Sequence, residues 1–173
     1  MSEPAKTTRG VAEQSRGRTT SALVSYVPSI QQPGVARQDL RDRDDVIRLV
    51  ETFYDRAFQD PVIGRFFTEV FVMDLPAHLP IMADFWQTVL FQAGLYRRSA
   101  LAVHVALHAL EPLTVAHFNR WLQLWTRTVD ELFAGEKAEL AKVQAHHIAG
   151  SLHRRVTGHP ASALTTIATR PPG

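Results

Sequence analysis

Two histidines four residues apart are the first candidates for metal chemistry in this 173-residue chain. His104 and His108 lie in the run YRRSALAVHVALHAL (96–110), and this spacing places both imidazoles on one face of a helix. A closed zinc site needs two further ligands, and Val-Ala-Leu between the histidines offers no carboxylate to activate water. A porphyrin iron needs only one imidazole ligand from the protein. Spacing alone leaves a zinc pair, a single iron ligand and two ordinary histidines open.

Three polar side chains on other apolar helix faces are the second set of candidates. Tyr54 shares a face with aliphatic and aromatic residues, and a buried tyrosine hydroxyl needs a partner. The indole of Trp121 can only donate a hydrogen bond. His78 precedes Met82 by one turn. Each of the three is more often a packing or surface residue when it stands alone, but together they could point donors at one cavity from three helices.

Apolar residues recur with helical spacing in the segments that must position these side chains. The predicted helices cover residues 39–60, 75 or 76 to 91, about 100–109, 115 to about 133 with Thr114 as the cap, and about 137–156. No segment shows the period-two alternation of a strand. The fold class predicted is all-α, with four long helices, one shorter helix and short connections.

The two ends of the chain differ in composition from the middle. Residues 1–38 are rich in Ser, Thr, Gly, Gln and Pro, which predicts a flexible N-terminal arm, with an Arg-rich targeting arm as the alternative. Residues 157–173 have Gly and Pro at both ends and predict a flexible C-terminal tail. The domain is expected to span residues 39–156.

Composition excludes several kinds of site. The chain has no cysteine, so disulfides, iron–sulfur clusters and covalently attached haem are excluded, and metal chemistry must use His and carboxylates. No apolar run reaches the roughly 18 residues of a membrane span, and the N-terminus lacks a secretory apolar core. The net charge is +2, without a basic stripe. We therefore expect a cytoplasmic protein with no membrane or nucleic-acid partner.

Four stretches in this order resemble the truncated haemoglobins of the third group. They are FYDRAFQDPVIGRFF (53–67), HLPIMADFW (78–86), GLYRRSALAVH (94–104) and LTVAHFNRWLQLWTRTVDELF (113–133). The resemblance covers about residues 44–156. It implies a truncated globin, a two-over-two helical sandwich around haem b, with much of the proximal helix replaced by a loop and one short turn.

The resemblance also implies roles for individual residues. It makes His104 the proximal iron ligand and gives His108 no ligand role. Tyr54 and Trp121 correspond to distal donors to a bound ligand, and His78 to a distal gate. The remaining expected cofactor-binding residues are Phe67, Met82, Phe85 and Tyr96, together with Arg98 from the loop described next.

One segment departs from the family pattern. The family commonly reads Y-x-G-N-P before the proximal histidine, whereas this chain has Tyr96 followed by RRSA (97–100). Loss of Gly and Pro changes the backbone freedom of this loop. We expect its two arginines, Arg97 and Arg98, to reach the anionic haem propionates instead.

The implied function is binding of O2, and of NO and CO, with high retention, because two donors would hold the ligand. Scavenging, sensing or redox work then fits better than bulk O2 transport. Activity resembling an NO dioxygenase or a peroxidase stays open, as do an unidentified reductase partner and a monomer or weak homodimer. The alternatives are a helical interaction domain without a cofactor, and a di-histidine zinc protein.

Overall fold

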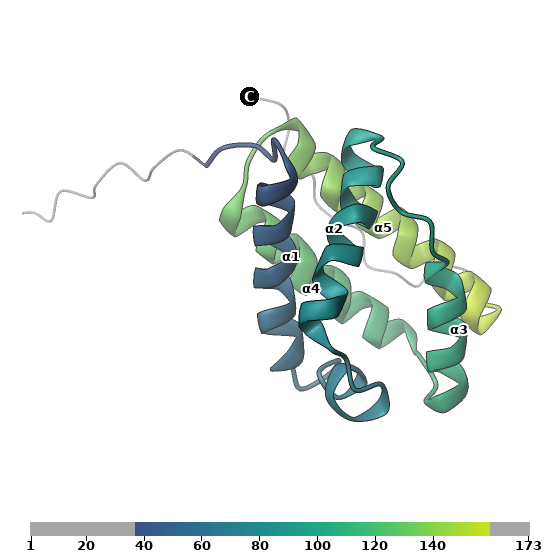
Figure 1. Ribbon diagram of the computed structural model, residues 1–173. Coiled ribbons are helices and arrows are strands. Elements are labelled where there is room, and N and C mark those ends of the chain that lie inside the picture. Colours follow the sequence, from purple (N-terminus) through teal and green to yellow (C-terminus); the bar gives the residue numbers. More distant parts are fainter. Residues whose placement is uncertain (1–36, 160–173) are drawn as a thin grey trace, which may run out of the picture. The chain divides into compact units, whose positions relative to one another are not determined.

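The structure is a computed structural model that describes residues 37–159. The predicted arm and tail lie outside these residues, apart from the last two of the arm and the first three of the tail. Every regular element in the described range is helical. The elements are α1 (Arg43–Phe58), η1 (Phe66–Val70), α2 (Leu75–Phe91), α3 (Ala100–Leu110), α4 (Val115–Leu132) and α5 (Glu136–Thr157) (Figure 1). The all-α prediction is confirmed.

Short polar residues fix where the helices begin. Asp42, Asp74 and Ser99 each accept a backbone N–H from the first turn of α1, α2 and α3 respectively. At α4, the N-cap Thr114 donates its own N–H to Nδ1 of His117, 3.1 Å away. Side-chain acceptors at these positions satisfy donors that have no partner within the helix. The helix starts predicted from the sequence therefore lie within a few residues of those observed.

The helices pack as two crossed pairs. Helix α1 packs on α2 and α4 packs on α5, while contacts of α1 with α4 and of α2 with α5 join the two pairs (Figure 1). The interior of this sandwich is aromatic, with Phe53, Trp86 and Trp125 each 1 % exposed. Helix α3 packs against α5. No helix within residues 37–159 combines the length and the apolar character that crossing a membrane requires.

One element departs from what the resemblance implied, and another from what spacing predicted. The resemblance implied one short turn in the proximal region, but α3 has 11 residues, as the helix predicted from spacing over about 100–109 required. Ser99 caps this helix, and its Ala- and Leu-rich sequence has high helix propensity. The segment after Asp60, expected to be a tight connection, contains the five-residue π-helix η1. This element keeps Phe66 buried and leaves Phe67 half-buried.

Candidate functional site

Tyr54 and His78 form a hydrogen-bonded pair between α1 and α2. The hydroxyl of Tyr54 lies 3.0 Å from Nε2 of His78, and the two rings meet edge to face with centroids 5.4 Å apart. Tyr54 is only 6 % exposed, so water cannot readily replace His78 as its partner. The structure thus joins two of the three predicted polar side chains directly.

Burial favours the uncharged form of both members of this pair. It raises the pKa of the Tyr54 hydroxyl far above its ordinary value. Burial also lowers the pKa of His78, and the positive charge of Arg98 lowers it further. A neutral imidazole next to a neutral phenol can accept its proton, because one ring nitrogen then carries a free lone pair.

Two phenylalanines that stack on each other also contact Tyr54. Phe67 of η1 meets the Tyr54 ring edge to face at 5.8 Å, and Phe58 does so at 6.2 Å. Phe58 and Phe67 also stack on each other at 5.6 Å. The predicted contact residue Phe67 therefore belongs to the same cluster as Tyr54 and His78.

Trp121 joins the cluster through Phe53. Its ring contacts that of Phe53 edge to face at 5.7 Å, and Phe53 contacts Tyr54 in the same way at 5.2 Å. Trp121 also lies parallel to Trp125, with centroids 5.7 Å apart. The indole N–H of Trp121 can only donate a hydrogen bond. Among residues 37–159 we find no acceptor for it.

The two histidines of α3 have opposite hydrogen-bonding roles. Nδ1 of His104 lies 2.8 Å from the carbonyl oxygen of Ala100, which can only accept, so Nδ1 carries the proton and Nε2 a lone pair. Nδ1 of His108 accepts the N–H of Leu113 at 2.9 Å, so its proton lies on Nε2. Burial lowers the pKa of His104 and favours the neutral form. Of these two histidines, only His104 has a free lone pair on Nε2.

A zinc site at this pair has no support in the described part of the chain. Within residues 37–159, no group of three or more His, Asp or Glu side chains is placed to hold a metal ion. A closed zinc site takes four ligands. His104 also has no hydrogen bond or ring contact with the Tyr54–His78 pair among the described residues.

Thr88 anchors the loop that departs from the family pattern. Its hydroxyl oxygen accepts the N–H groups of Leu95 and Tyr96 at 2.9 and 3.0 Å and donates to the carbonyl oxygen of Asp84 at 2.8 Å. Sequence reasoning missed Thr88, because a threonine on a helix gives no signal of a tertiary contact. Two residues at the start of the loop have left-handed backbone conformations, Gln92 with φ of 57° and Gly94 with φ of 63°.

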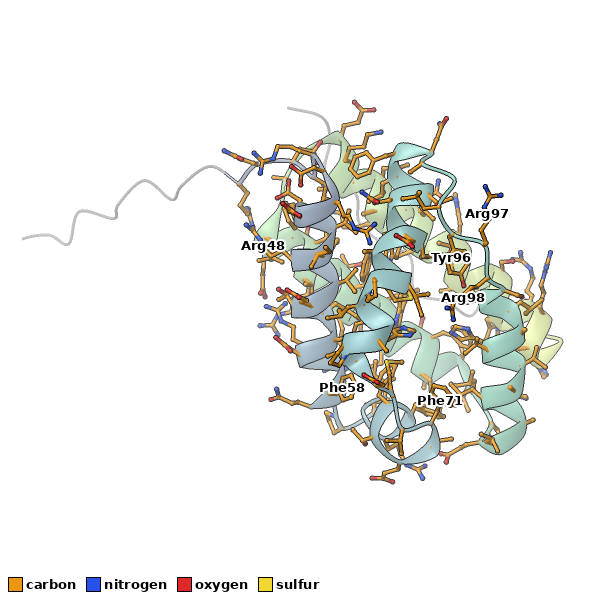
Figure 2. The ribbon with its side chains drawn as sticks, in the orientation of Figure 1. Arg48, Phe58, Phe71, Tyr96, Arg97 and Arg98 are labelled. Atoms are coloured by element: carbon orange, nitrogen blue, oxygen red, sulfur yellow. The ribbon has the colours of Figure 1, made fainter. Side chains whose placement is uncertain are left out.

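The two arginines of this loop point in different directions. Figure 2 shows Arg97 extending away from the helices, whereas Arg98 lies on the side facing α2. Burial raises the pKa of Tyr96, and Arg98 opposes that rise as well as lowering the pKa of His78. The ring of Tyr96 meets Phe85 edge to face at 5.0 Å. Phe85 and Met82 are half-buried and packed against the core. Of the two arginines, only Arg98 faces the candidate site.

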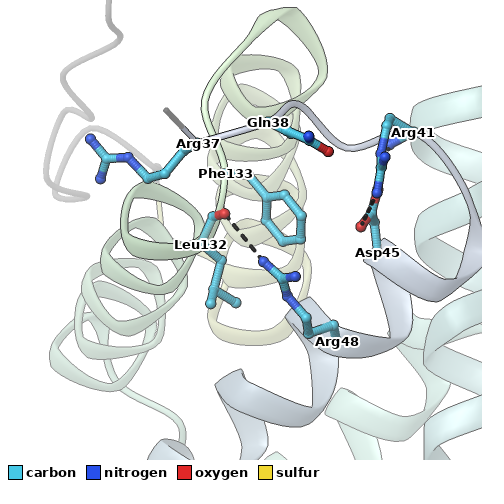
Figure 3. A pocket seen from close by; sticks show the side chains of 7 residues that line it. All are labelled: Arg37, Gln38, Arg41, Asp45, Arg48, Leu132 and Phe133. Carbon is cyan, nitrogen blue, oxygen red and sulfur yellow. Dashed lines mark hydrogen bonds and ion pairs between the residues drawn. The ribbon is translucent and has the colours of Figure 1, made fainter. Parts of the chain in front are cut away.

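A separate hollow of about 270 Å³ lies where α1 begins and α4 ends (Figure 3). It is lined by Arg37, Gln38, Arg41, Asp45, Arg48, Leu132 and Phe133. Arg41 pairs with Asp45 at 2.9 Å, and Arg48 lies 4.8 Å over the ring of Phe133. These arginines already have partners, and none of the lining residues was predicted to be functional.

Comparison with known proteins supports the fold. No family model matches the chain, and no curated protein matches it. Among solved structures, it is similar to the group III truncated hemoglobin from Campylobacter jejuni, with a TM-score of 0.61 and 21% sequence identity. The match covers 69% of this chain and 94% of that one. The chain therefore has the fold of a truncated haemoglobin.

Proposed function

We propose that this chain binds haem b through Nε2 of His104 and retains a small diatomic ligand beside Tyr54, His78 and Trp121. The observation that carries the proposal is the hydrogen bond from Nδ1 of His104 to Ala100, which leaves Nε2 free. Such a bond fixes the tautomer and orientation of a ligating imidazole. The fold, a neutral imidazole at His104 and the unpartnered indole N–H of Trp121 all suit a haem.

Haem would supply an iron with one open coordination position for a diatomic molecule such as O2. The hydroxyl of Tyr54 and the indole N–H of Trp121 would donate to that ligand. Each hydrogen bond to a charged or strongly polarised acceptor in a buried site contributes about 1.5–3 kcal/mol. Two such bonds slow release, so we infer scavenging, sensing or redox work rather than bulk transport.

Other residues of the loop and helices would hold the cofactor itself. Phe67, Met82, Phe85 and Tyr96 offer apolar contacts to the porphyrin. Arg98 faces the site and carries the charge that complements the propionates, while Arg97 points away. Any redox cycle would need an electron donor, so the proposal includes a reductase partner. We expect a monomer or weak homodimer.

An absorption spectrum tests the proposal directly. We expect the purified full-length chain to show a Soret band that shifts when CO is added to the reduced protein. His104→Ala should lose the five-coordinate ferrous spectrum, whereas the matched control His108→Ala should keep it. A chain that takes up no haem would favour a cofactor-free helical domain. An unchanged spectrum in His104→Ala would refute the ligand assignment.

The Tyr54–His78 pair favours a peroxidase-like reaction as the second candidate. His78 is neutral, because burial lowers its pKa, and Nε2 already lies within proton-transfer distance of a hydroxyl. It could take a proton from a peroxide and return it to the leaving oxygen. We expect His78→Leu to lose peroxide turnover while still binding haem. Equal turnover in this variant and the parent would eliminate His78 from the reaction.

A further inference from the structure

All three tryptophans of the chain lie in one stack. Trp86 of α2 lies on Trp125 of α4, with centroids 4.2 Å apart and planes 15° from parallel. Trp125 in turn faces Trp121 at 5.7 Å, with planes 4° from parallel. Trp86 and Trp125 are each 1 % exposed, whereas Trp121 is half-buried. The stack therefore runs from the interior to the candidate ligand site.

Phe53 connects this stack to Tyr54. Its ring meets Trp121 at 5.7 Å, Trp125 at 5.4 Å and Tyr54 at 5.2 Å, in each case edge to face. Electron transfer weakens steeply with the gap between aromatic rings, and rings in contact keep that gap small. Two of the three indoles thus have a contact route to Tyr54 through one ring.

Tyr54 can also release its proton at the moment it loses an electron. Oxidation makes a phenol strongly acidic, and Nε2 of His78 lies 3.0 Å from the hydroxyl. The indole of Trp125 has no comparable base, because its N–H donates to the carbonyl oxygen of Ala141 at 3.3 Å. An oxidised Trp125 therefore keeps its proton as a radical cation. That radical cation is a stronger oxidant than the neutral tyrosyl radical that forms when Tyr54 loses an electron and its proton.

We propose that the tryptophan stack, Phe53 and the Tyr54–His78 pair form a one-electron relay that carries an oxidising equivalent from the indoles to Tyr54. Tyr54 loses one electron, which reduces the tryptophan radical cation to tryptophan. Its O–H bond breaks, and an N–H bond forms at Nε2 of His78. The products are tryptophan, a neutral tyrosyl radical and an imidazolium, so electrons, protons and charge balance.

The use of this relay in the protein rests on the proposed function. The proposed haem would supply the oxidising equivalent by reducing a hydroperoxide, and Trp121, the half-buried indole of the stack, would be the ring that loses the electron. The relay then removes the radical from the core indoles, whose oxidation would damage the sandwich, and holds it on Tyr54. Packing alone explains why aromatic rings fill a core. It does not require an acid–base pair at the end of the stack.

Pulse radiolysis of the haem-free full-length chain tests the relay without the cofactor. Azide radicals would oxidise tryptophan, and the decay of the tryptophyl absorbance is compared with the rise of the tyrosyl absorbance. All chains carry Tyr26→Phe, which removes the tyrosine outside the described residues. We expect a first-order exchange whose rate does not depend on protein concentration. Circular dichroism of every variant confirms that the helices are retained.

The variants separate the relay from its alternatives. Tyr54→Phe should abolish the exchange and the matched control Tyr96→Phe should leave it unchanged, although Phe85 also contacts both Trp86 and Tyr96. His78→Leu should slow the exchange by removing the proton acceptor, and Phe53→Leu by widening the ring gap. Exchange that survives in Tyr54→Phe, or depends on protein concentration, overturns the relay. These outcomes are independent of whether the chain takes up haem.

Discussion

Replacing His78 with leucine should strengthen retention of a diatomic ligand, although His78 is a polar residue of the proposed distal side. In the ligand-free protein, His78 is the hydrogen-bond partner of the Tyr54 hydroxyl at 3.0 Å. In His78→Leu this hydroxyl is left buried and unpartnered until a ligand arrives. An unsatisfied buried group costs about 1–3 kcal/mol. Ligand binding would restore that free energy.

The expected gain in O2 affinity follows from the cost of this unpartnered hydroxyl. A coupling of about 1–3 kcal/mol changes an affinity by roughly 5–150-fold. Because Tyr54 is 6 % exposed, water can offset little of the loss, and we expect at least about fivefold tighter O2 binding. The measurement is the O2 dissociation rate and affinity of the ferrous haem-loaded chain by stopped flow and gas titration.

A double variant identifies the origin of any gain. His78→Leu combined with Tyr54→Phe removes both the competing acceptor and the donor, so the gain should disappear. Weaker O2 binding in His78→Leu alone would mean that His78 supports the ligand rather than competes for Tyr54. That result would refute the reasoning, which takes Nε2 of His78 as the acceptor of the Tyr54 hydroxyl proton. Weaker binding would instead fit a His78 whose Nε2 donates to Tyr54.

Three further predictions concern stability and the departing loop. Asp39→Ala should lower the free energy of unfolding by about 1–2 kcal/mol in urea titrations, because the Asp39 carboxylate accepts the N–H groups of Lys137 and Ala138 at the start of α5. The control is Asp55→Ala, which removes an exposed carboxylate of α1. Equal effects of the two substitutions would contradict the capping role of Asp39. Thr88→Val should speed haem loss and proteolysis of the 92–99 loop, since the backbone N–H groups of Leu95 and Tyr96 lose their acceptor. Parent-like rates in both assays would show that the loop does not depend on Thr88. The contribution of His153 to stability should be fully present above about pH 6.5 and lost as the pH falls below it, because burial holds the pKa of this histidine below its ordinary value and the unfolded chain then binds more protons. Urea midpoints measured on both sides of that pH check this, and a drop that is just as large in His153→Leu would assign the effect to other groups.

The sequence predicts the helices well because their ends depend on local chemistry. Capping side chains and apolar periodicity act within a few residues, so Leu75–Phe91 and Val115–Leu132 lie close to the predicted spans. The π-helix η1 depends instead on how a connection packs, which periodicity does not encode. The same limit hid the role of Thr88, whose two acceptor contacts reach residues of a separate loop.

The aromatic residues of the candidate site show where spacing stops being informative. Trp121 and Trp125 are four residues apart, so the sequence predicts that they share a helix face. That Trp86 from another helix completes the stack is a tertiary fact. Likewise, Tyr54 and His78 each fall on an apolar face, but only the packing of α1 on α2 sets their polar atoms 3.0 Å apart.

His104 and His108 show how structure adds a chemical distinction that spacing lacks. Both have the same side chain, helix and face, and nothing in the sequence assigns a proton to either ring nitrogen. The backbone does so, because a carbonyl oxygen can only accept and an N–H can only donate. Ala100 therefore places the proton of His104 on Nδ1, and Leu113 places that of His108 on Nε2. A ligating imidazole needs a free lone pair and a fixed opposite nitrogen, and among these two histidines His104 alone meets both conditions at Nε2.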